Sequence, residues 1–295
     1  MSSAAERNLD EDVALRTATE AGAVEWAKHG CEFWTSSRGR RLFCRWWLPD
    51  EYVQTTSIKA AFIILHGLHG HSGRFPHVAE VLTSRGYKVF SFDYEGHGRS
   101  VGTHGHFERF EGLLSDIRSF RAKVSDFVGS DHKIFLLGHS LGGFLAISAA
   151  IETECAAVLV SAPVLKIVTP VPFRVVWVLS ELIPRLEVKK IVHGPEVEED
   201  PLLFHGGVNI RQVAELLTAL RKLNESAKNF KTPIYLAHSI HDPTTDPEGS
   251  KEFFETVSAP KKFLKLYDDI TVHELLHPLY CERVLTDMLR WLGGL

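Results

Sequence analysis

Two serines stand at the centre of a Gly-x-Ser-x-Gly motif, the spacing in which a serine hydroxyl can act as a nucleophile: Ser100 and Ser140. Such a serine needs a strand that runs into a strained turn and then into a helix, because this geometry lifts the hydroxyl above the sheet. Ser140 follows the apolar run 134–137 directly and precedes the helix-forming run 141–151. Ser100 lies several residues beyond its strand, and no helix-forming run follows it. We therefore predict that Ser140 is the nucleophile and that Ser100 has a role within a loop.

An acid and a base must accompany this serine, because a serine hydroxyl is a poor nucleophile at neutral pH. In the strand–turn–helix arrangement, the acid and then the histidine follow the serine along the chain. Asp242 comes just after the apolar run 233–237 and is the predicted acid. Asp246 precedes Pro247 and is more simply explained as a helix N-cap.

Two histidines, His273 and His277, follow the apolar run 263–267 in the last loop. Chain order and loop position favour His273 as the general base, and His277 is the alternative. The same residues spell His-Glu-x-x-His, which binds zinc when both imidazoles lie on one continuous helix. Pro278 follows His277 at once, and a proline inside a helix removes a hydrogen bond and clashes with the preceding turn. We expect neither a metal nor any other cofactor.

A glycine-rich loop, 66–75, begins where the apolar run 60–65 ends. In this arrangement an oxyanion is held by the N–H of the residue after the nucleophile and by an N–H from this first loop. The predicted donors are the backbone N–H groups of Leu68 and Leu141. Loss of one such donor typically raises the reaction barrier by about 3 kcal/mol.

Compact apolar runs separated by helix-like segments must position these residues. Most runs are continuous rather than alternating, as in strands that are covered on both faces of a parallel sheet. After a hairpin (32–35 and 41–47), the expected strands are 60–65, 87–92, 133–137, 157–160, 233–237 and 263–267, and the expected helices are 75–84, 110–128, 141–151, 247–257 and 278–291. This order predicts an α/β fold with a mostly parallel central sheet and helices on both faces.

The alternation of strand-like and helix-like segments stops between residues 163 and 231. There we expect a helical cap over the carboxyl ends of the strands. The chain then divides into an N-terminal extension (1–30), a hydrolase-type core (31–162 and 232–295) and the inserted cap (163–231). The apolar stretch 164–183 has the length of a membrane span, but it contains prolines and three charged residues. Such a stretch is not expected to cross a membrane.

Composition excludes further classes of partner. The chain has 295 residues with 33 basic and 37 acidic side chains, and this net charge of −4 gives no electrostatic surface for nucleic acid. Charged residues near the N-terminus interrupt any signal-peptide core. Four cysteines without metal-ligand spacing are expected to be reduced thiols, with Cys155 a small buried residue. We expect a cytoplasmic location, and peripheral membrane contact through the cap is an additional hypothesis.

Six motifs occur in a fixed order along residues 31–292. They are His66-Gly67 with His71-Ser72-Gly73-Arg74-Phe75, then Asp93-Tyr94-Glu95-Gly96-His97-Gly98-Arg99-Ser100, Gly138-His139-Ser140-Leu141-Gly142-Gly143, Asp200-Pro201-Leu202, Asp242 with Asp246-Pro247-Glu248-Gly249-Ser250, and His273-Glu274-Leu275. In these motifs the chain resembles the monoacylglycerol lipases of the α/β-hydrolase superfamily and their plant lysophospholipase-like relatives. The resemblance implies the α/β-hydrolase fold, a triad at Ser140, Asp242 and His273, and oxyanion donors at Leu68 and Leu141.

The resemblance also implies contacts with a substrate. Arg74 falls on a residue thought to help anchor a glycerol head group. Gly70 stands where an acidic residue is usual, and the polar group expected after the catalytic histidine is offset to His277, so both positions depart from the pattern for glycerol recognition. The cap resembles a lid whose apolar residues would face acyl chains or lipid, with ordinary packing onto the core as the alternative. These cap residues are Val171, Phe173, Val175, Val176, Trp177, Leu179 and Leu182; Phe173 and Trp177 are the predicted substrate contacts.

The expected function is hydrolysis of a monoacylglycerol to a fatty acid and glycerol through an acyl-enzyme intermediate. The expected partner is therefore a small single-chain lipid ester. A lysophospholipase or a broad-specificity carboxylesterase is the alternative among enzymes. A non-catalytic binding protein with the same fold is the alternative from another class, and an apparently complete triad argues against it. The oligomeric state is not predicted.

Overall fold

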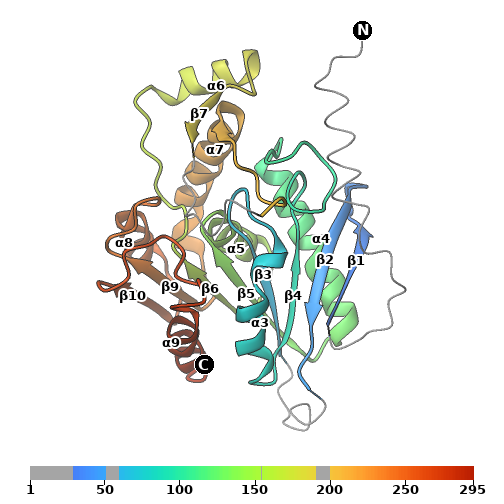
Figure 1. The fold of residues 1–295 in the computed structure, drawn as a ribbon. Coiled ribbons are helices and arrows are strands. Elements are labelled where there is room, and N and C mark those ends of the chain that lie inside the picture. The colour runs from blue at the N-terminus through green and yellow to red at the C-terminus, as the bar shows by residue number, and fades with distance from the viewer. Residues whose placement is uncertain (1–28, 51–59, 154, 191–199) are drawn as a thin grey trace.

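An eight-stranded sheet runs through the middle of the protein in a computed structural model that describes residues 29–50, 60–153, 155–190 and 200–295 (Figure 1). The strand order is β1-β2-β4-β3-β5-β6-β9-β10. β1 and β2 form an antiparallel hairpin, β2 is antiparallel to β4, and the remaining pairs are parallel. The strands are β1 (His29–Thr35), β2 (Arg41–Trp47), β3 (Ala60–Leu65), β4 (Lys88–Phe92), β5 (Lys133–His139), β6 (Ala157–Ser161), β9 (Ile234–Ser239) and β10 (Lys262–Tyr267). The predicted fold class is confirmed.

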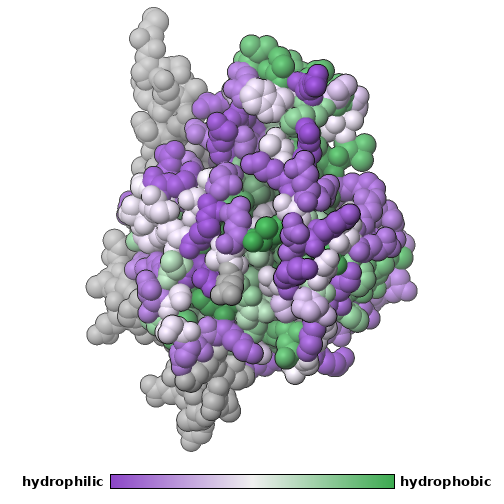
Figure 2. Space-filling model, turned by 180° about the vertical axis from the view of Figure 1, so that it is seen from behind, coloured by the Kyte–Doolittle hydropathy of each residue, from purple (hydrophilic) through white to green (hydrophobic). Residues whose placement is uncertain are grey.

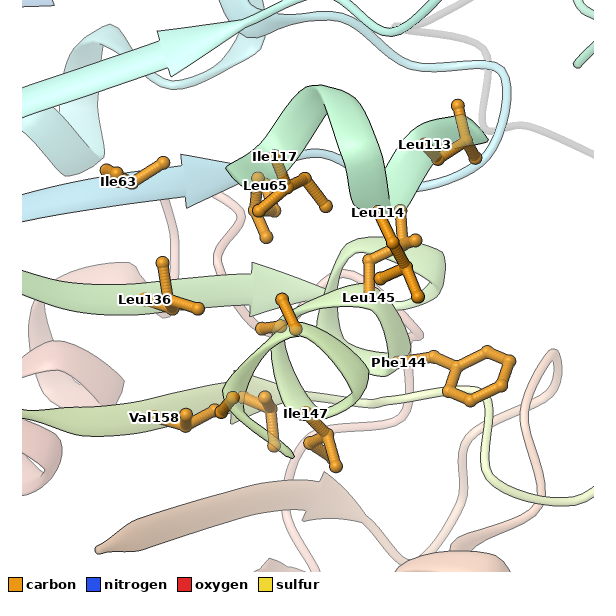
Figure 3. Close-up of a cluster of buried hydrophobic side chains, with 14 of the residues drawn as sticks. Ile63, Leu65, Leu113, Leu114, Ile117, Leu136, Phe144, Leu145, Ile147 and Val158 are labelled. Atoms are coloured by element: carbon orange, nitrogen blue, oxygen red, sulfur yellow. The ribbon is translucent and has the colours of Figure 1, made fainter. Parts of the chain in front are cut away.

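Helices cover both faces of this sheet. They are α3 (Pro76–Thr83), α4 (Phe110–Val128), α5 (Leu141–Glu152), α8 (Pro247–Thr256) and α9 (Cys281–Leu292). Alternate residues of β3 point to opposite faces: Ile63 joins a cluster with residues of α4 and α5, and Phe62 joins a cluster with residues of α3 and α9. Figure 3 shows the first cluster, where Ile117 of α4 and Leu145 of α5 pack over Leu65 and Leu136. Burial on both faces explains why these strands are continuously apolar, since each buried large side chain contributes about 1.5–3 kcal/mol.

The segment between β6 and β9 rises above the sheet as the predicted cap (Figure 1). It contains α6 (Phe173–Leu182), β7 (Glu187–Lys190), β8 (Gly207–Asn209), α7 (Ile210–Ser226) and the short 3₁₀ helix η3 (Ala227–Asn229). Val176 of α6 packs on Ile210 and Ala214 of α7 in a small separate cluster. Farther along α7, Leu220 and Leu223 belong to the main core. α7 therefore carries the cap at its first turns and is anchored in the core at its last turns.

Several sequence-based boundaries differ from the structure or lie outside it. α9 begins at Cys281 rather than at Pro278, because residues 274–280 form turns in which the N–H of Cys281 donates to the carbonyl of His277. The predicted extension 1–30 lies outside the described residues except for His29 and Gly30, which begin β1. The cap boundaries at 163 and 231 remain predictions.

The four cysteines are free, and Cys155 is half-buried rather than buried as predicted. It follows the end of α5 and packs against the core from its edge. None of the helices in the described part of the chain is long and apolar enough to span a bilayer.

Candidate active site

Ser140 occupies the strained turn between β5 and α5. Its φ of 55° and ψ of −119° lie in a region that side chains other than glycine rarely adopt. Its N–H donates to the carbonyl of Ser161 at 2.9 Å, and its carbonyl accepts from Phe144 N–H at 3.1 Å. Bonds from both neighbouring elements hold the turn, so the strain is maintained by the fold. Ser140 is thus presented above the sheet, as the sequence predicted for a nucleophile.

Two glycines allow this turn to form. A Cβ on Gly138 would lie 2.2 Å from the carbonyl oxygen of Gly142, and a Cβ on Gly142 would lie 2.0 Å from the carbonyl oxygen of Leu65. Both distances are far below contact distance, so strand and helix can meet at this crossing only without side chains. The same crowding brings the end of β3 against the start of α5.

The structure brings Asp242 and His273 together, although 31 residues separate them. Asp242 follows β9, His273 follows β10, and these two strands are neighbouring and parallel, so their carboxyl ends meet at one edge. The Nδ1 of His273 lies 2.7 Å from Oδ2 of Asp242. His277 is placed differently: its Nδ1 accepts the N–H of Leu279.

The Asp242 carboxylate is held ionised by its neighbours. Burial alone would raise the pKa of Asp242, but hydrogen bonds from His238 and His273 hold that pKa well below its usual range. The N–H groups of Thr244 and Thr245 donate to Oδ1 at 2.7 and 3.0 Å, and the Thr245 hydroxyl donates to Oδ2 at 2.9 Å. An ionised carboxylate in this position can stabilise a protonated His273 during a reaction.

The other ring nitrogen of His273, Nε2, is the candidate acceptor for the Ser140 proton. This nitrogen is buried and has no hydrogen-bond partner among the described residues, so no bond to Ser140 is formed in this state. His139, directly before Ser140, places its ring centroid 4.7 Å from that of His273. Catalytic hydrogen bonds are often long before the substrate binds and shorten in the reacting complex. Nε2 of His273 is therefore left with no competing partner among the described residues and can accept a serine proton.

The loop after β3 packs directly on this turn. A Cβ on Gly67 would contact Cβ of Ser140 at 3.4 Å, so the backbone next to Leu68 lies beside the serine. His66 anchors the loop: its Nδ1 lies 2.8 Å from the carbonyl of Gly67, and its Nε2 accepts the N–H of Tyr94 at 3.2 Å. Burial lowers the pKa of His66 to about 3, so the ring stays neutral and keeps both bonds. As the first residue of α5, Leu141 has an N–H that the helix itself does not use.

A charged pair lies beside the catalytic histidine. Nη1 of Arg74 is 3.3 Å from Oε1 of Glu274, which directly follows His273, and Oε2 of Glu274 is 3.8 Å from Nε2 of His139. Burial opposes ionisation of Glu274, but its electrostatic interactions with His139 and Arg74 lower its pKa overall. Glu274 thus provides a carboxylate beside Arg74, whereas Gly70 lacks the acid that the resemblance would place in the first loop. Sequence reasoning did not single out Glu274.

Residues 200–204 of the cap contact the loop that follows β3. Nε2 of His71 lies 2.8 Å from Oδ2 of Asp200, and the N–H of Phe204 donates to the carbonyl of His69. The Phe204 ring packs edge-on against His69 and His104, with centroids 4.8 and 5.4 Å away. The resemblance pointed to Asp200, and the structure gives it this anchoring contact.

The structure also shows where Ser100, Asp246 and His277 lie. The Ser100 hydroxyl donates to the carbonyl of Asp93 and accepts the N–H of Phe43, as expected of a loop residue. Asp246 caps α8 by accepting the N–H of Glu248. His273 and His277 do not share a helix, and no group of metal-ligating side chains occurs within the described ranges.

The apolar residues of α6 divide between two environments. Val176 is buried and Leu179 is partly buried against α7, so the expectation that they face lipid is wrong for these two. The guanidinium of Arg221 lies over the Phe173 ring at 5.1 Å, which ties Phe173 to α7. Trp177 is 46% exposed, and the other exposed large apolar residues in the described part of the cap are Val168, Val171, Val175, Val178, Leu182, Ile183, Leu186 and Val188. Figure 2 shows hydrophobic surface gathered at this top of the protein.

The chain is similar to known proteins in sequence and in fold. The family model Hydrolase_4, described as serine aminopeptidase, S33, matches residues 56–279. The chain is similar to a monoglyceride lipase of Homo sapiens, with 30% identity over 81% of this chain and 81% of the relative. It is also 30% identical to an abhydrolase domain-containing protein of Dictyostelium discoideum over 79% of this chain, but it spans only 26% of that protein's length. The crystal structure of a monoacylglycerol lipase of Paleococcus ferrophilus has 26% identity and a TM-score of 0.72, and the match covers 86% of this chain and 98% of that chain.

Proposed function

This chain belongs to the Hydrolase_4 family of α/β-hydrolases, and we propose that it is a serine ester hydrolase that cleaves monoacylglycerols to fatty acid and glycerol. The observation that carries the proposal is the Asp242–His273 hydrogen bond beside the strained turn of Ser140. The human relative and the Paleococcus structure, both lipases by name, support the choice of substrate.

In the proposed reaction Ser140 Oγ attacks the ester carbonyl while Nε2 of His273 takes the serine proton. The resulting tetrahedral oxyanion accepts hydrogen bonds from the N–H groups of Leu68 and Leu141. His273 then gives its proton to the departing glycerol oxygen, which leaves an acyl group on Ser140. A water molecule, deprotonated by His273, attacks this acyl-enzyme, and the fatty acid leaves as the proton returns to Ser140. Asp242 accepts Nδ1–H throughout and stabilises the imidazolium.

The charged pair beside His273 favours a neutral head group. Arg74 can donate to glycerol hydroxyls, and Glu274 can accept from them, so a diol satisfies both groups. A phosphate would gain from Arg74 but would be repelled by Glu274. We therefore favour a monoacylglycerol over a lysophospholipid as the substrate, with His277 near the same loop as a further polar group.

The exposed apolar residues of the cap support contact with lipid. Soluble monomers rarely expose a large contiguous apolar surface without a partner for it. Trp177 and its exposed neighbours on and around α6 are suited to rest against a lipid surface while the acyl chain enters below them. We propose a cytoplasmic enzyme, consistent with four free thiols, that touches membranes peripherally through this cap.

Replacing Ser140 with alanine tests the proposal directly. Ser140→Ala should abolish hydrolysis of monoacylglycerols and labelling by a fluorophosphonate, with a loss of at least about 10⁴-fold in kcat. Ser100→Ala is the matched control, because it removes the serine of the other Gly-x-Ser-x-Gly motif from a loop outside the site. Labelling that persists in Ser140→Ala, or disappears in folded Ser100→Ala, contradicts the assignment.

A further inference from the structure

A second imidazole contacts the carboxylate of Asp242. His238 lies on β9, four residues before Asp242, and its side chain is fully buried. Its Nε2 is 3.2 Å from Oδ2 of Asp242, the same oxygen that lies 2.7 Å from Nδ1 of His273. Nε2 is also 3.2 Å from Oγ1 of Thr245, whose own proton is directed to Oδ2, so both neighbours of Nε2 can accept a hydrogen bond from it. Two histidines therefore share one carboxylate oxygen, and the mechanism uses only His273.

The other ring nitrogen of His238 contacts a serine on α8. Nδ1 of His238 lies 2.7 Å from Oγ of Ser250, and both side chains are fully buried. An ionised carboxylate can only accept a hydrogen bond, so the contact with Asp242 requires a proton on Nε2 of His238. In the neutral ring Nδ1 is then an acceptor, and the Ser250 hydroxyl can donate to it. A chain of hydrogen bonds thus runs from Ser250 through His238 and Asp242 to His273.

The position of Ser250 is set by the start of α8. Asp246 caps the helix, and Pro247 begins it. A Cβ on Gly249 would lie 2.9 Å from the backbone nitrogen of Lys166, so the first turn of α8 packs closely on the segment after β6. The Lys166 ammonium also pairs with Glu252 at 2.6 Å. These contacts hold Ser250 over the ring, which gives a physical role to the Asp246–Ser250 motif that the catalytic triad leaves unexplained.

We propose that His238 and Ser250 are positioning residues for the hydrolase reaction, an inference that rests on the proposed function. Ser250 fixes the Nε2–H tautomer of His238, and Nε2–H holds Oδ2 of Asp242 in the orientation that accepts Nδ1–H of His273. Neither residue touches the substrate. The donor from His238 also draws charge from Oδ2, so it moderates how strongly Asp242 stabilises protonated His273. Burial opposes the negative charge of Asp242. The hydrogen bonds that the carboxylate accepts stabilise this charge and keep the pKa of Asp242 low.

Kinetics of single variants test this role. Ser250→Ala should lower kcat for a p-nitrophenyl ester by about 5-fold and leave KM within about twofold, because it alters orientation rather than binding. His238→Leu should lower kcat by about 100-fold, and His238→Gln, whose side-chain amide can still donate to Oδ2, should restore most of that loss. In Ser250→Ala the acid limb of the kcat/KM–pH profile should move to higher pH, because Asp242 then holds protonated His273 more strongly. His139, Glu274 and Arg74 also face His273 and are unchanged in all of these variants.

Ser91→Ala is the matched control, because Ser91 is equally buried and its hydroxyl donates one hydrogen bond, to the carbonyl of Ile64. Thermal unfolding should show a similar loss of stability in both serine variants, whereas only Ser250→Ala should move the acid limb. A purely structural role for Ser250 would lower stability and leave the limb in place, and that result overturns the proposal.

A measurement that does not depend on turnover keeps the two proposals apart. In ¹⁵N-histidine NMR of the whole protein, the His238 signals, assigned by their loss in His238→Gln, should report a neutral ring protonated at Nε2. Ser250→Ala should shift part of this population to the Nδ1–H form. A wild-type ring protonated at Nδ1 overturns the positioning role even if esters are cleaved. A wild-type protein that cleaves no ester contradicts the proposed function, and the NMR tautomer then decides the positioning role alone.

Discussion

The catalytic edge of the sheet and the cap helix α6 are built in opposite ways. At the edge, polar side chains such as His66, His238 and Ser140 are buried, and the loops around them are held by hydrogen bonds from several elements. On α6, apolar side chains point outward, and Val178 and Leu182 are 56% and 72% exposed. Buried polar groups are stable only where their hydrogen bonds are satisfied, so the edge tolerates little change in geometry. The exposed face of α6 has no such requirement.

This difference separates fixed chemistry from adaptable contact. The edge lies on two core clusters, one on each face of the sheet, whereas α6 rests on α7 through the small cluster around Val176. Regions with few buried apolar contacts open locally at a lower free energy than the core does. We therefore expect α6 to open locally at a lower free energy than the edge that carries Ser140, Asp242 and His273.

The largest effect is expected where the edge is most crowded. Gly138→Ala places a Cβ 2.2 Å from the Gly142 carbonyl oxygen, so the variant should lose more than about 3 kcal/mol of stability and fail to label with a fluorophosphonate. Gly293→Ala is the control, because the nearest atom to its added Cβ is 3.5 Å away, an ordinary contact. Urea unfolding and labelling measure both. A Gly138→Ala protein with wild-type stability would show that the edge is more adaptable than we infer.

The second-largest effect is expected at low pH, where buried histidines at the edge should lower the free energy of unfolding. Burial lowers the pKa of His66 to about 3, lowers that of His139 to about 4, and lowers that of His97 well below its ordinary value. Below pH 6.5 the unfolded chain binds protons at these histidines that the folded chain does not, so stability falls as pH falls. Each histidine contributes at most about 1.4 kcal/mol per pH unit between 6.5 and its folded pKa.

Urea unfolding at pH 7.0 and 5.5 should therefore show a loss of about 4 kcal/mol. His139→Gln removes one of the three groups and should reduce the slope by about a third. Stability that does not change over this range contradicts the account of neutral, buried histidines at the edge.

The third prediction concerns the head group of the substrate. Glu274→Gln removes the negative charge beside Arg74, so hydrolysis of an anionic lysophospholipid relative to a neutral monoacylglycerol should rise about tenfold. Glu111→Gln makes the same charge change in a surface pair with Arg118 and should leave the ratio unchanged. Side-by-side kcat/KM values for the two substrates measure it. An equal change in both variants would mean that overall charge, rather than the edge, sets selectivity.

The smallest effect is expected at the cap. Val178→Ser with Leu182→Ser should reduce binding to phosphatidylcholine vesicles and hydrolysis of vesicle-borne monoacylglycerol by about 3- to 10-fold, because less apolar area is buried in lipid. Hydrolysis of soluble p-nitrophenyl acetate should not change. Phe263→Ser, at a similarly exposed site on β10, is the control. If Phe263→Ser weakens vesicle binding as strongly, the cap is not the lipid-contacting surface.

The sequence predicted the edge better than the cap. Continuous apolar runs and the glycines around Ser140 have strong local signals, and chain order then selected Asp242 and His273, whose side chains lie 2.7 Å apart. No local signal separated Val176 from Trp177, because both are large and apolar and only the position of α7 decides which one is covered.

Contacts between side chains on different elements were also missed. His238 stands at the end of a strand like many buried histidines, and its neighbour Ser250 is evident only once α8 is placed over β9. The four-residue spacing from His238 to Asp242 is the one signal that sequence analysis could have used. Glu274 occurred in two motifs, the zinc motif and His273-Glu274-Leu275, but received no role, because its pairing with Arg74 joins residues 200 positions apart.

α7 packs against the cap helix α6 with its first turns and within the main core with its last turns, so the cap segment that precedes it can be exchanged. Its N-terminus is closed by the reciprocal bonds of Asn209 and Gln212, and its later turns are embedded in the core through Leu220 and Leu223. A chimera that substitutes residues 167–186 from another lipase would keep α7 and the contacts of Asp200 and Phe204 with the first loop. The preference for acyl-chain length can then be engineered in the cap without changing Ser140, Asp242 or His273.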